Sequence, residues 1–186
     1  MNEFLILIIL KLRPSNIYEI KKIIDRNFAP FMQISVGVII PILKKFEKLN
    51  AVKKEVTMTG GGLKRSVYSV LECGETLINN YLTEEIICAP QLLRREIDIL
   101  MFIYGAENFP LLENEEKIYC EILTPEQKKL LGIKIKTALE NNIKIIQDSV
   151  NYNQINPEFL NLELIYSEAK LRLLNNDDEE ILNNLN

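Results

Sequence analysis

Two short segments of the sequence carry basic side chains at a spacing that suits contacts with phosphate groups. Lys44, Lys45 and Lys48 would occupy neighbouring positions on one side of a helix, because residues three and four apart face the same way. Lys64 and Arg65 come soon after three consecutive glycines at 60–62. Solvated lysines are common on any helix, so the pattern points to phosphate only if both segments belong to a nucleic-acid-binding fold.

The glycine run is not a nucleotide-binding loop. Such a loop ends in Gly-Lys-Ser/Thr after four spacer residues and leads into a helix. Here Leu63 separates the glycines from Lys64, and a strand-like segment rich in Val, Tyr and Ser follows. The sequence therefore predicts a hairpin tip, at which Lys64 and Arg65 contact either phosphate or solvent.

Catalytic chemistry finds little support in the composition. The chain contains no histidine, which excludes Ser-His-Asp and Cys-His arrangements and every His-ligated metal site. Paired carboxylates at 84–85, 115–116 and 177–178 are adjacent in sequence, and such neighbours do not face each other on a helix. The cysteines at 73, 88 and 120 fit no zinc spacing. We expect no enzyme, no metal and no cofactor.

Charge divides the chain into two unlike halves. Residues 1–82 contain 12 Lys/Arg and 7 Asp/Glu, a net charge of +5, while residues 83–186 contain 10 and 19, a net charge of −9. The total is the −4 of the whole chain. A mildly basic module can approach phosphates, whereas an acidic one is better suited to protein contacts.

The N-terminal half has the element order of a winged helix. Helices are expected over 2–12, 16–27 and 35–49, the second opened by an Asn cap with Glu three residues later and the third by Ser35. Ile39, Leu43, Phe46 and Leu49 form the predicted buried stripe of the third helix. Strand-like segments at 52–57 and 65–71 flank the glycines, which accept the positive φ angles of a hairpin.

From about residue 75 the pattern is helical throughout. Three amphipathic helices follow residue 90, and the last is opened by an Asn cap and Pro157. Their apolar content favours packing across a dimer, with an intramolecular bundle as the alternative. The predicted fold is mainly α with a small β-hairpin wing, with a winged helix-turn-helix domain at 1–85 and a helical dimerisation domain at 86–186.

Residues 35–49 resemble the third-helix signature of the PadR family of transcriptional regulators. They read Ser-Val-Gly-Val-Ile-Ile-Pro-Ile-Leu-Lys-Lys-Phe-Glu-Lys-Leu, and the family has Ser, Gly and Pro in this order, then Leu, a basic pair, a bulky apolar residue and Glu. Residues 17–20, Ile-Tyr-Glu-Ile, fall where the family has Gly-Tyr-Glu-Leu. Residues 65–70 with Gly74 fall on its wing strand and the turn after it. The matches cover about residues 4–82, and the later helices resemble those through which longer members pair.

The resemblance implies a set of DNA-binding residues, and two of them depart from the family. Val38 and Ile40 replace the Ser and Tyr of the third helix, so they offer only apolar contacts, for example with thymine methyl groups. The family's His before Gly-Tyr-Glu also has no counterpart. The predicted DNA-binding residues are Ser35, Val38, Ile40, Lys44, Lys45, Lys48, Lys64 and Arg65.

These patterns predict a homodimeric transcription regulator that binds double-stranded operator DNA, with repression as the expected outcome. The alternative is a winged helix that has lost base reading and serves as a protein-interaction or adaptor module. The resemblance also implies a small-molecule effector, and Phe102, Tyr104, Phe109 and Tyr119 are candidates either for lining its cavity or for ordinary core packing.

A cytoplasmic location without a membrane partner is expected. The apolar run at 4–10 is far shorter than the roughly 20 residues that span a bilayer. It also lacks the flanks of a signal peptide. We therefore expect a buried first helix and free cysteine thiols.

Overall fold

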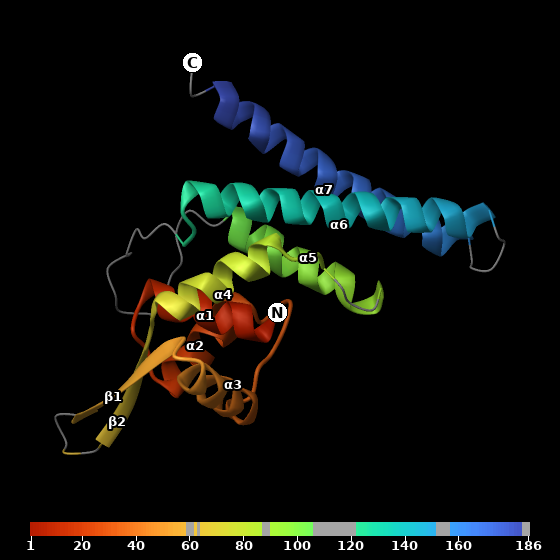
Figure 1. Ribbon diagram of the computed structural model, residues 1–186. Coiled ribbons are helices and arrows are strands. Elements are labelled where there is room, and N and C mark those ends of the chain that lie inside the picture. Colours follow the sequence, from red (N-terminus) through yellow and green to blue (C-terminus); the bar gives the residue numbers. More distant parts are fainter. Residues whose placement is uncertain (59–61, 63, 87–89, 106–121, 152–156, 184–186) are drawn as a thin grey trace.

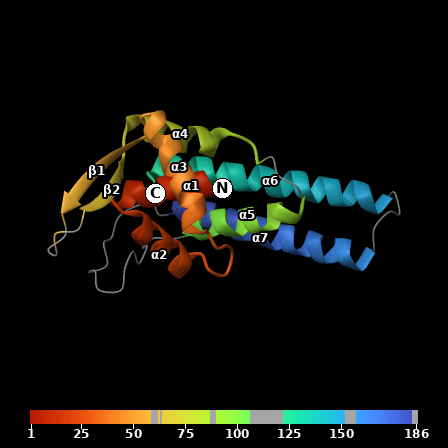
Figure 2. The same ribbon diagram turned by 90° about the horizontal axis from the view of Figure 1, so that it is seen from below.

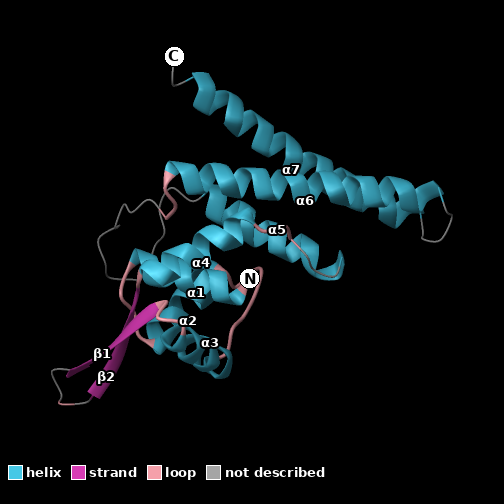
Figure 3. Ribbon diagram, in the orientation of Figure 1, coloured by secondary structure: helices cyan, strands magenta, loops and turns pink. Residues whose placement is uncertain are grey.

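A computed structural model of the chain describes all residues except 59–61, 63, 87–89, 106–121, 152–156 and 184–186. In this part of the chain, seven helices and one two-stranded antiparallel sheet form the architecture (Figures 1 and 3). Their bounds are α1 Asn2–Leu12, α2 Ile17–Asn27, α3 Val36–Lys48, β1 Val52–Met58, β2 Lys64–Val70, α4 Glu72–Thr83, α5 Pro90–Gly105, α6 Pro125–Asn151 and α7 Pro157–Asn183. The predicted fold class, mainly helical with a hairpin wing, is confirmed.

The start of α2 is fixed by the capping box that the sequence predicted. The Asn16 side chain accepts hydrogen bonds from the N–H groups of Tyr18 and Glu19, at 2.8 and 3.1 Å. In return, the Glu19 carboxylate accepts a bond of 2.9 Å from the Asn16 N–H. These bonds satisfy N–H groups that a helix start leaves without partners.

The bounds of α3 agree with the prediction, but its ends differ from it in detail. Ser35 is the N-cap, yet its side chain makes no capping hydrogen bond. Leu49, which the sequence placed in the buried stripe, is 47% exposed, because the helix ends at Lys48 and Leu49 has left the helical face. Asn50 then takes a positive φ of 51°, which turns the chain into β1.

The hairpin of β1 and β2 is anchored at its base. Val52 pairs with Val70 and Met58 with Lys64, so the strands remain in register along their whole length. Ser15, just before α2, exchanges two backbone hydrogen bonds of 2.9 Å with Tyr68 of β2. Gly62 has the positive φ, 75°, that the hairpin prediction required, while the glycines at 60 and 61 lie outside the described residues.

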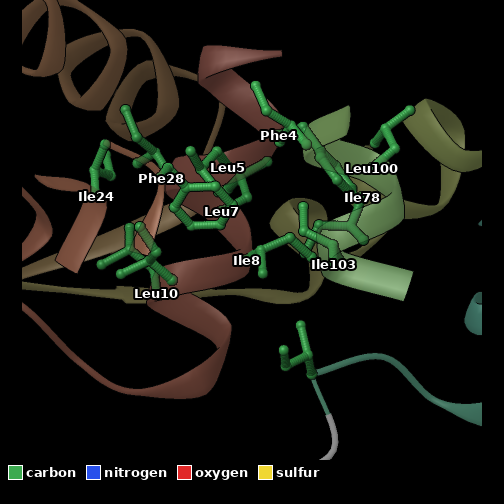
Figure 4. Close-up of a cluster of buried hydrophobic side chains, with 14 of the residues drawn as sticks. Phe4, Leu5, Leu7, Ile8, Leu10, Ile24, Phe28, Ile78, Leu100 and Ile103 are labelled. Carbon is green, nitrogen blue, oxygen red and sulfur yellow. The ribbon is translucent and has the colours of Figure 1, made fainter. Parts of the chain in front are cut away.

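One hydrophobic core extends through both halves of the chain, with α1 at its centre. Every side chain of α1 from Phe4 to Leu10 is buried, as expected for a helix that is apolar all round. Figure 4 shows Leu5 beside Phe28, which directly follows α2, whereas Phe4 points towards Ile78 of α4 and Leu100 of α5. The predicted domain boundary at 85/86 falls between α4 and α5, and this core crosses it.

The two longest helices form the C-terminal part. α6 and α7 lie side by side and extend beyond the rest of the molecule, away from the hairpin (Figure 2). Each has 27 residues and is therefore about 40 Å long. Within the described residues, no helix is long and apolar enough to cross a membrane.

Gly74 is the glycine whose replacement the packing tolerates least. A Cβ at this position of α4 would lie 2.5 Å from Val70 Cγ2 and even closer to the Ala51 carbonyl oxygen. The close approach joins α4 to the base of the hairpin, so Gly74→Ala is expected to lower the free energy of unfolding by about 1–3 kcal/mol. Denaturant titration measures the change. Gly105→Ala is the control, because its Cβ would meet nothing within 4 Å, and equal losses would contradict the prediction.

Candidate nucleic-acid interface

The exposed face of α3 is the first part of the candidate interface. Ile39, Leu43 and Phe46 are buried against the core, and this fixes which side of α3 faces outwards. The outer side carries four exposed residues at spacings of four, three and four, namely Gly37, Pro41, Lys44 and Lys48. α3 lies at the outer surface of the N-terminal half, next to the hairpin (Figure 1).

The three lysines predicted on α3 divide into two kinds. Lys44 and Lys48 are exposed, four residues apart, and neither makes an ion pair within the described part of the chain. Lys45 is turned back towards α1, where its Nζ lies 2.7 and 2.8 Å from the two carboxylate oxygens of Glu3. Lys44 and Lys48 are therefore available to bind an anion from outside the chain, whereas Lys45 already binds the Glu3 carboxylate.

Val38 and Ile40 lie on opposite flanks of the exposed face of α3. Residues two apart are separated by about 160° around a helix, so both cannot occupy its centre. Val38 is 40% exposed and Ile40 is half-buried. Ser35 is exposed at the N-terminal end, and Pro41, which the sequence reading did not single out, occupies the middle of the face. The spacing of Gly37, Pro41, Lys44 and Lys48 was the signal that would have identified Pro41.

The hairpin brings Lys64 and Arg65 to different surroundings. Lys64 is exposed at the start of β2 and makes no ion pair with any described residue. The Arg65 guanidinium instead forms an ion pair and a hydrogen bond with the Glu19 carboxylate. Arg13 approaches the same carboxylate at 3.9 Å. Arg65 thus joins the wing to the first turn of α2, and of these two residues Lys64 is the one that faces outwards.

Glu19 is the electrostatic centre of this junction. Its side chain is 19% exposed, and burial alone would raise the pKa of the carboxyl group. The hydrogen bonds from Arg65 and from the Asn16 N–H, with the charges of Arg65 and Arg13, outweigh burial and hold the pKa below its usual 4.5. The ionised form is therefore favoured by folding, and it holds the hairpin and α2 in a fixed relation.

Glu19→Gln is expected to lower the free energy of unfolding by about 1–2 kcal/mol at neutral pH, because a charge-assisted hydrogen bond is lost in a mostly buried setting. A carboxyl group with a depressed folded pKa stabilises the protein fully above its unfolded pKa, and this contribution disappears as the pH falls through the folded pKa. The difference between the two proteins should therefore shrink below about pH 4.5. Urea titrations at pH 7 and pH 3.5 measure it, with exposed Glu140→Gln as control. A difference that does not depend on pH would contradict the assignment.

Tyr18 and two residues of the wing are exposed, although they are not among the predicted DNA-binding residues. Tyr18, in the first turn of α2, is 79% exposed, so its hydroxyl is free to donate to a phosphate. Val56 and Met58 of β1 are also exposed, on the part of the wing nearest its tip. The sequence signal for Tyr18 was its position one residue before the capping Glu.

The candidate aromatic residues do not come together within the described part of the chain. Tyr104 is buried, with Lys128 Nζ of α6 5.2 Å from its ring centroid. Phe102 lies on the other side of α5, where its ring meets Phe28 edge-on at 5.3 Å. Phe109 and Tyr119 lie outside the described residues. The two described rings thus pack against different helices.

No cluster of three or more His, Cys, Asp or Glu side chains that could hold an ion occurs in the described residues. Cys73 is an exposed free thiol, as predicted, whereas Cys88 and Cys120 lie outside the described residues. The exposed cations of α3 and of the hairpin, with the start of α2, make up the candidate binding surface.

Part of the chain is similar to a known protein family. The family model described as "Transcriptional regulator PadR-like family" matches residues 6–80, from α1 to α4. No match was found among curated proteins. Bacillus subtilis PadR in complex with operator DNA is 16% identical over 100% of this chain and 99% of that one, with a TM-score of 0.46.

Two further solved structures are similar over most of their length. Bacillus subtilis PadR in complex with p-coumaric acid is 14% identical over 94% of both chains, with a TM-score of 0.38. The Vibrio cholerae virulence activator AphA is 14% identical over 100% of both chains, with a TM-score of 0.37.

Proposed function

Because residues 6–80 belong to the PadR-like family of transcriptional regulators, we propose that this protein is a transcription regulator that binds double-stranded operator DNA as a homodimer. The observation that carries the proposal is the outward face of α3, where Lys44 and Lys48 are exposed and pair with none of the described residues. A recognition helix of this kind enters the major groove, and the hairpin then reaches the neighbouring backbone or minor groove.

The charge distribution supports this orientation. The half that carries α3 and the hairpin has a net charge of +5, whereas the half that carries α5, α6 and α7 has a net charge of −9. Phosphates attract the first and repel the second. This supports a DNA position on the side of α3 and the hairpin.

Base reading by this helix is expected to be modest. A bidentate base contact contributes roughly 1–3 kcal/mol of discrimination, and among the described side chains on the exposed face of α3 only Lys44 and Lys48 have several donors with which to make one. Val38 offers methyl groups, which suit thymine. A preference for A·T-rich DNA with a small ratio of specific to nonspecific affinity follows.

The dimer is proposed to form through the C-terminal helices. Along the outer side of α7 run Leu162, Ile165, Ala169 and Leu173, all exposed and at helical spacing. α6 adds Ile133 and Ile145, which are more than half exposed. A second copy is the partner we propose for this α7 stripe, since it would present the same apolar surface to its mate.

The remaining parts of the proposal follow from the regulator class. The partners are double-stranded DNA, a second copy of the chain and a small-molecule effector, and the expected outcome of binding is repression. The protein would act in the cytoplasm, where the DNA is, and would need neither catalysis nor a cofactor.

Fluorescence anisotropy with labelled 30-base-pair duplexes between 50 and 200 mM salt tests the proposal. The logarithm of the binding constant should fall linearly with the logarithm of the salt concentration, with a slope of about −0.9 per phosphate neutralised. A·T-rich duplexes should bind more tightly than G·C-rich ones. Absence of binding at 50 mM salt would refute the proposal and favour the adaptor alternative, for which the apolar flank at Val38 would be a protein contact.

A further inference from the structure

Lys134 of α6 is a buried cation that closes the end of α4. Only 7% of the residue is exposed. Its Nζ donates to the carbonyl oxygen of Tyr81 at 2.5 Å and to that of Glu84. Both carbonyls belong to the C-terminal end of α4, where a helix leaves acceptors without partners and favours positive charge. Lys134 thus adds a positively charged donor from α6 to the C-terminal end of α4.

Side chains from two further helices complete this contact. The Tyr81 ring lies 4.2 Å from Lys134 Nζ, and its hydroxyl donates to the Glu96 carboxylate of α5 at 2.7 Å. The Phe4 ring of α1 stacks on the Tyr81 ring, with a distance of 4.1 Å between the ring centroids. Four helices therefore meet around one ammonium group.

A second polar contact fixes α6 seven residues earlier. Gln127 donates to Asn79 Oδ1 of α4 at 2.7 Å. It also accepts from Lys11 of α1 at 2.9 Å, and Lys11 forms an ion pair of 3.0 Å with Glu75 of α4. Gln127 and Lys134 face the same side of α6, about 10 Å apart along its axis. Two attachment points define the direction of α6 relative to α4 as well as its position.

We propose that this joint, made by Lys134 and Gln127 with their partners on α4, sets the spacing of DNA half-sites that the dimer accepts. The inference rests on the proposed function. If the C-terminal helices hold two copies together, the path from one α3 to the other passes through both joints. A rigid joint fixes the separation and angle of the two recognition helices, and a loose joint lets each winged helix find its half-site independently.

The first part of the test needs no DNA. ¹⁵N relaxation of the full-length protein gives rotational correlation times for α3 and α6 separately. In the unaltered protein the two should agree. In Lys134→Met, which keeps a long side chain but loses the charge, the value for α3 should become shorter by about a fifth or more. Lys136→Met is the matched control, because Lys136 bonds Asn175 of α7 instead of α4.

The second part measures affinity for duplexes in which two copies of the preferred half-site are separated by different lengths. The unaltered protein and Lys136→Met should favour the best spacing by about tenfold over one changed by half a helical turn, whereas Lys134→Met should favour it by less than about threefold. If Lys134→Met fails to fold, Gln127→Leu, which cuts the other attachment, takes its place with the same expectations.

The outcomes separate the joint from the DNA function. If α3 and α6 have the same correlation time in Lys134→Met or Gln127→Leu, these contacts do not hold the two parts together and the proposal is wrong. The proposal is also wrong if the winged helix becomes mobile in a variant whose spacing preference is unchanged. If the unaltered protein prefers no sequence at all, the proposed function fails, and the spacing role fails with it. The relaxation measurement still decides whether the joint is rigid.

Discussion

A protein in which Leu162 and Ile165 are both replaced by glutamate is expected to be a monomer and to bind two-half-site DNA on the order of a hundredfold more weakly. Both side chains are more than 60% exposed on the α7 stripe. Fully burying a Leu or Ile contributes roughly 1.5–3 kcal/mol, and this contribution would be lost from both copies. Two carboxylates per chain would also face each other across the interface. The weaker DNA binding follows because each winged helix would then bind alone.

Sedimentation equilibrium and anisotropy measure the two effects. Asn141→Glu with Asn161→Glu is the control, since it adds the same charge at exposed polar positions of α6 and α7. A double variant of the α7 stripe that stays dimeric would contradict the interface. Truncation after residue 85 cannot replace this experiment, because removing α5 and α6 would uncover the part of the core that they share with α1 and α4.

The second large effect is expected from Lys44→Ala with Lys48→Ala. If each lysine neutralises one phosphate, a dimer loses about four contacts, and the salt slope should become shallower by about 3.6. Affinity at low salt should fall by on the order of a hundredfold for all sequences, because phosphate contacts carry no sequence information. Neither side chain has a role in the core, so thermal stability should stay the same.

Lys45→Ala is the matched control for this variant. Lys45 is held by Glu3, so its removal should leave the salt slope almost unchanged. Anisotropy titrations at four salt concentrations decide the matter. If Lys45→Ala flattens the slope as much as the double variant does, α3 presents a different face to DNA.

Local features of the fold were accessible to sequence reasoning. The capping box at Asn16 and Glu19 is a signal within four residues, and the all-apolar run of α1 predicts burial on every side. The buried face of α3 follows from spacing alone, and that spacing also places Val38 and Ile40 on opposite flanks.

The partners of charged side chains were not accessible in the same way. Arg65 and Glu19 are 46 residues apart, and Lys45 and Glu3 are 42 apart. Each pair forms only because tertiary packing brings α2 to the wing and α3 to α1. The sequence could therefore propose basic residues for the interface, but it could not tell Lys45 and Arg65, which already pair with carboxylates inside the molecule, from Lys44, Lys48 and Lys64. The burial of Lys134 likewise depends on how α6 packs across the end of α4, and local sequence does not show this packing.

The most direct test of the central claim is selection of bound duplexes from a random DNA library by the full-length protein. The account predicts enrichment of an inverted repeat with A·T-rich half-sites, whose centres are one helical turn of about 10–10.5 base pairs, or a multiple of it, apart. The two-fold symmetry of the dimer requires the repeat, and the apolar flank of α3 favours the thymines. Enrichment of a single unrepeated site, or of no sequence at all, would contradict the claim that this chain reads an operator as a dimer.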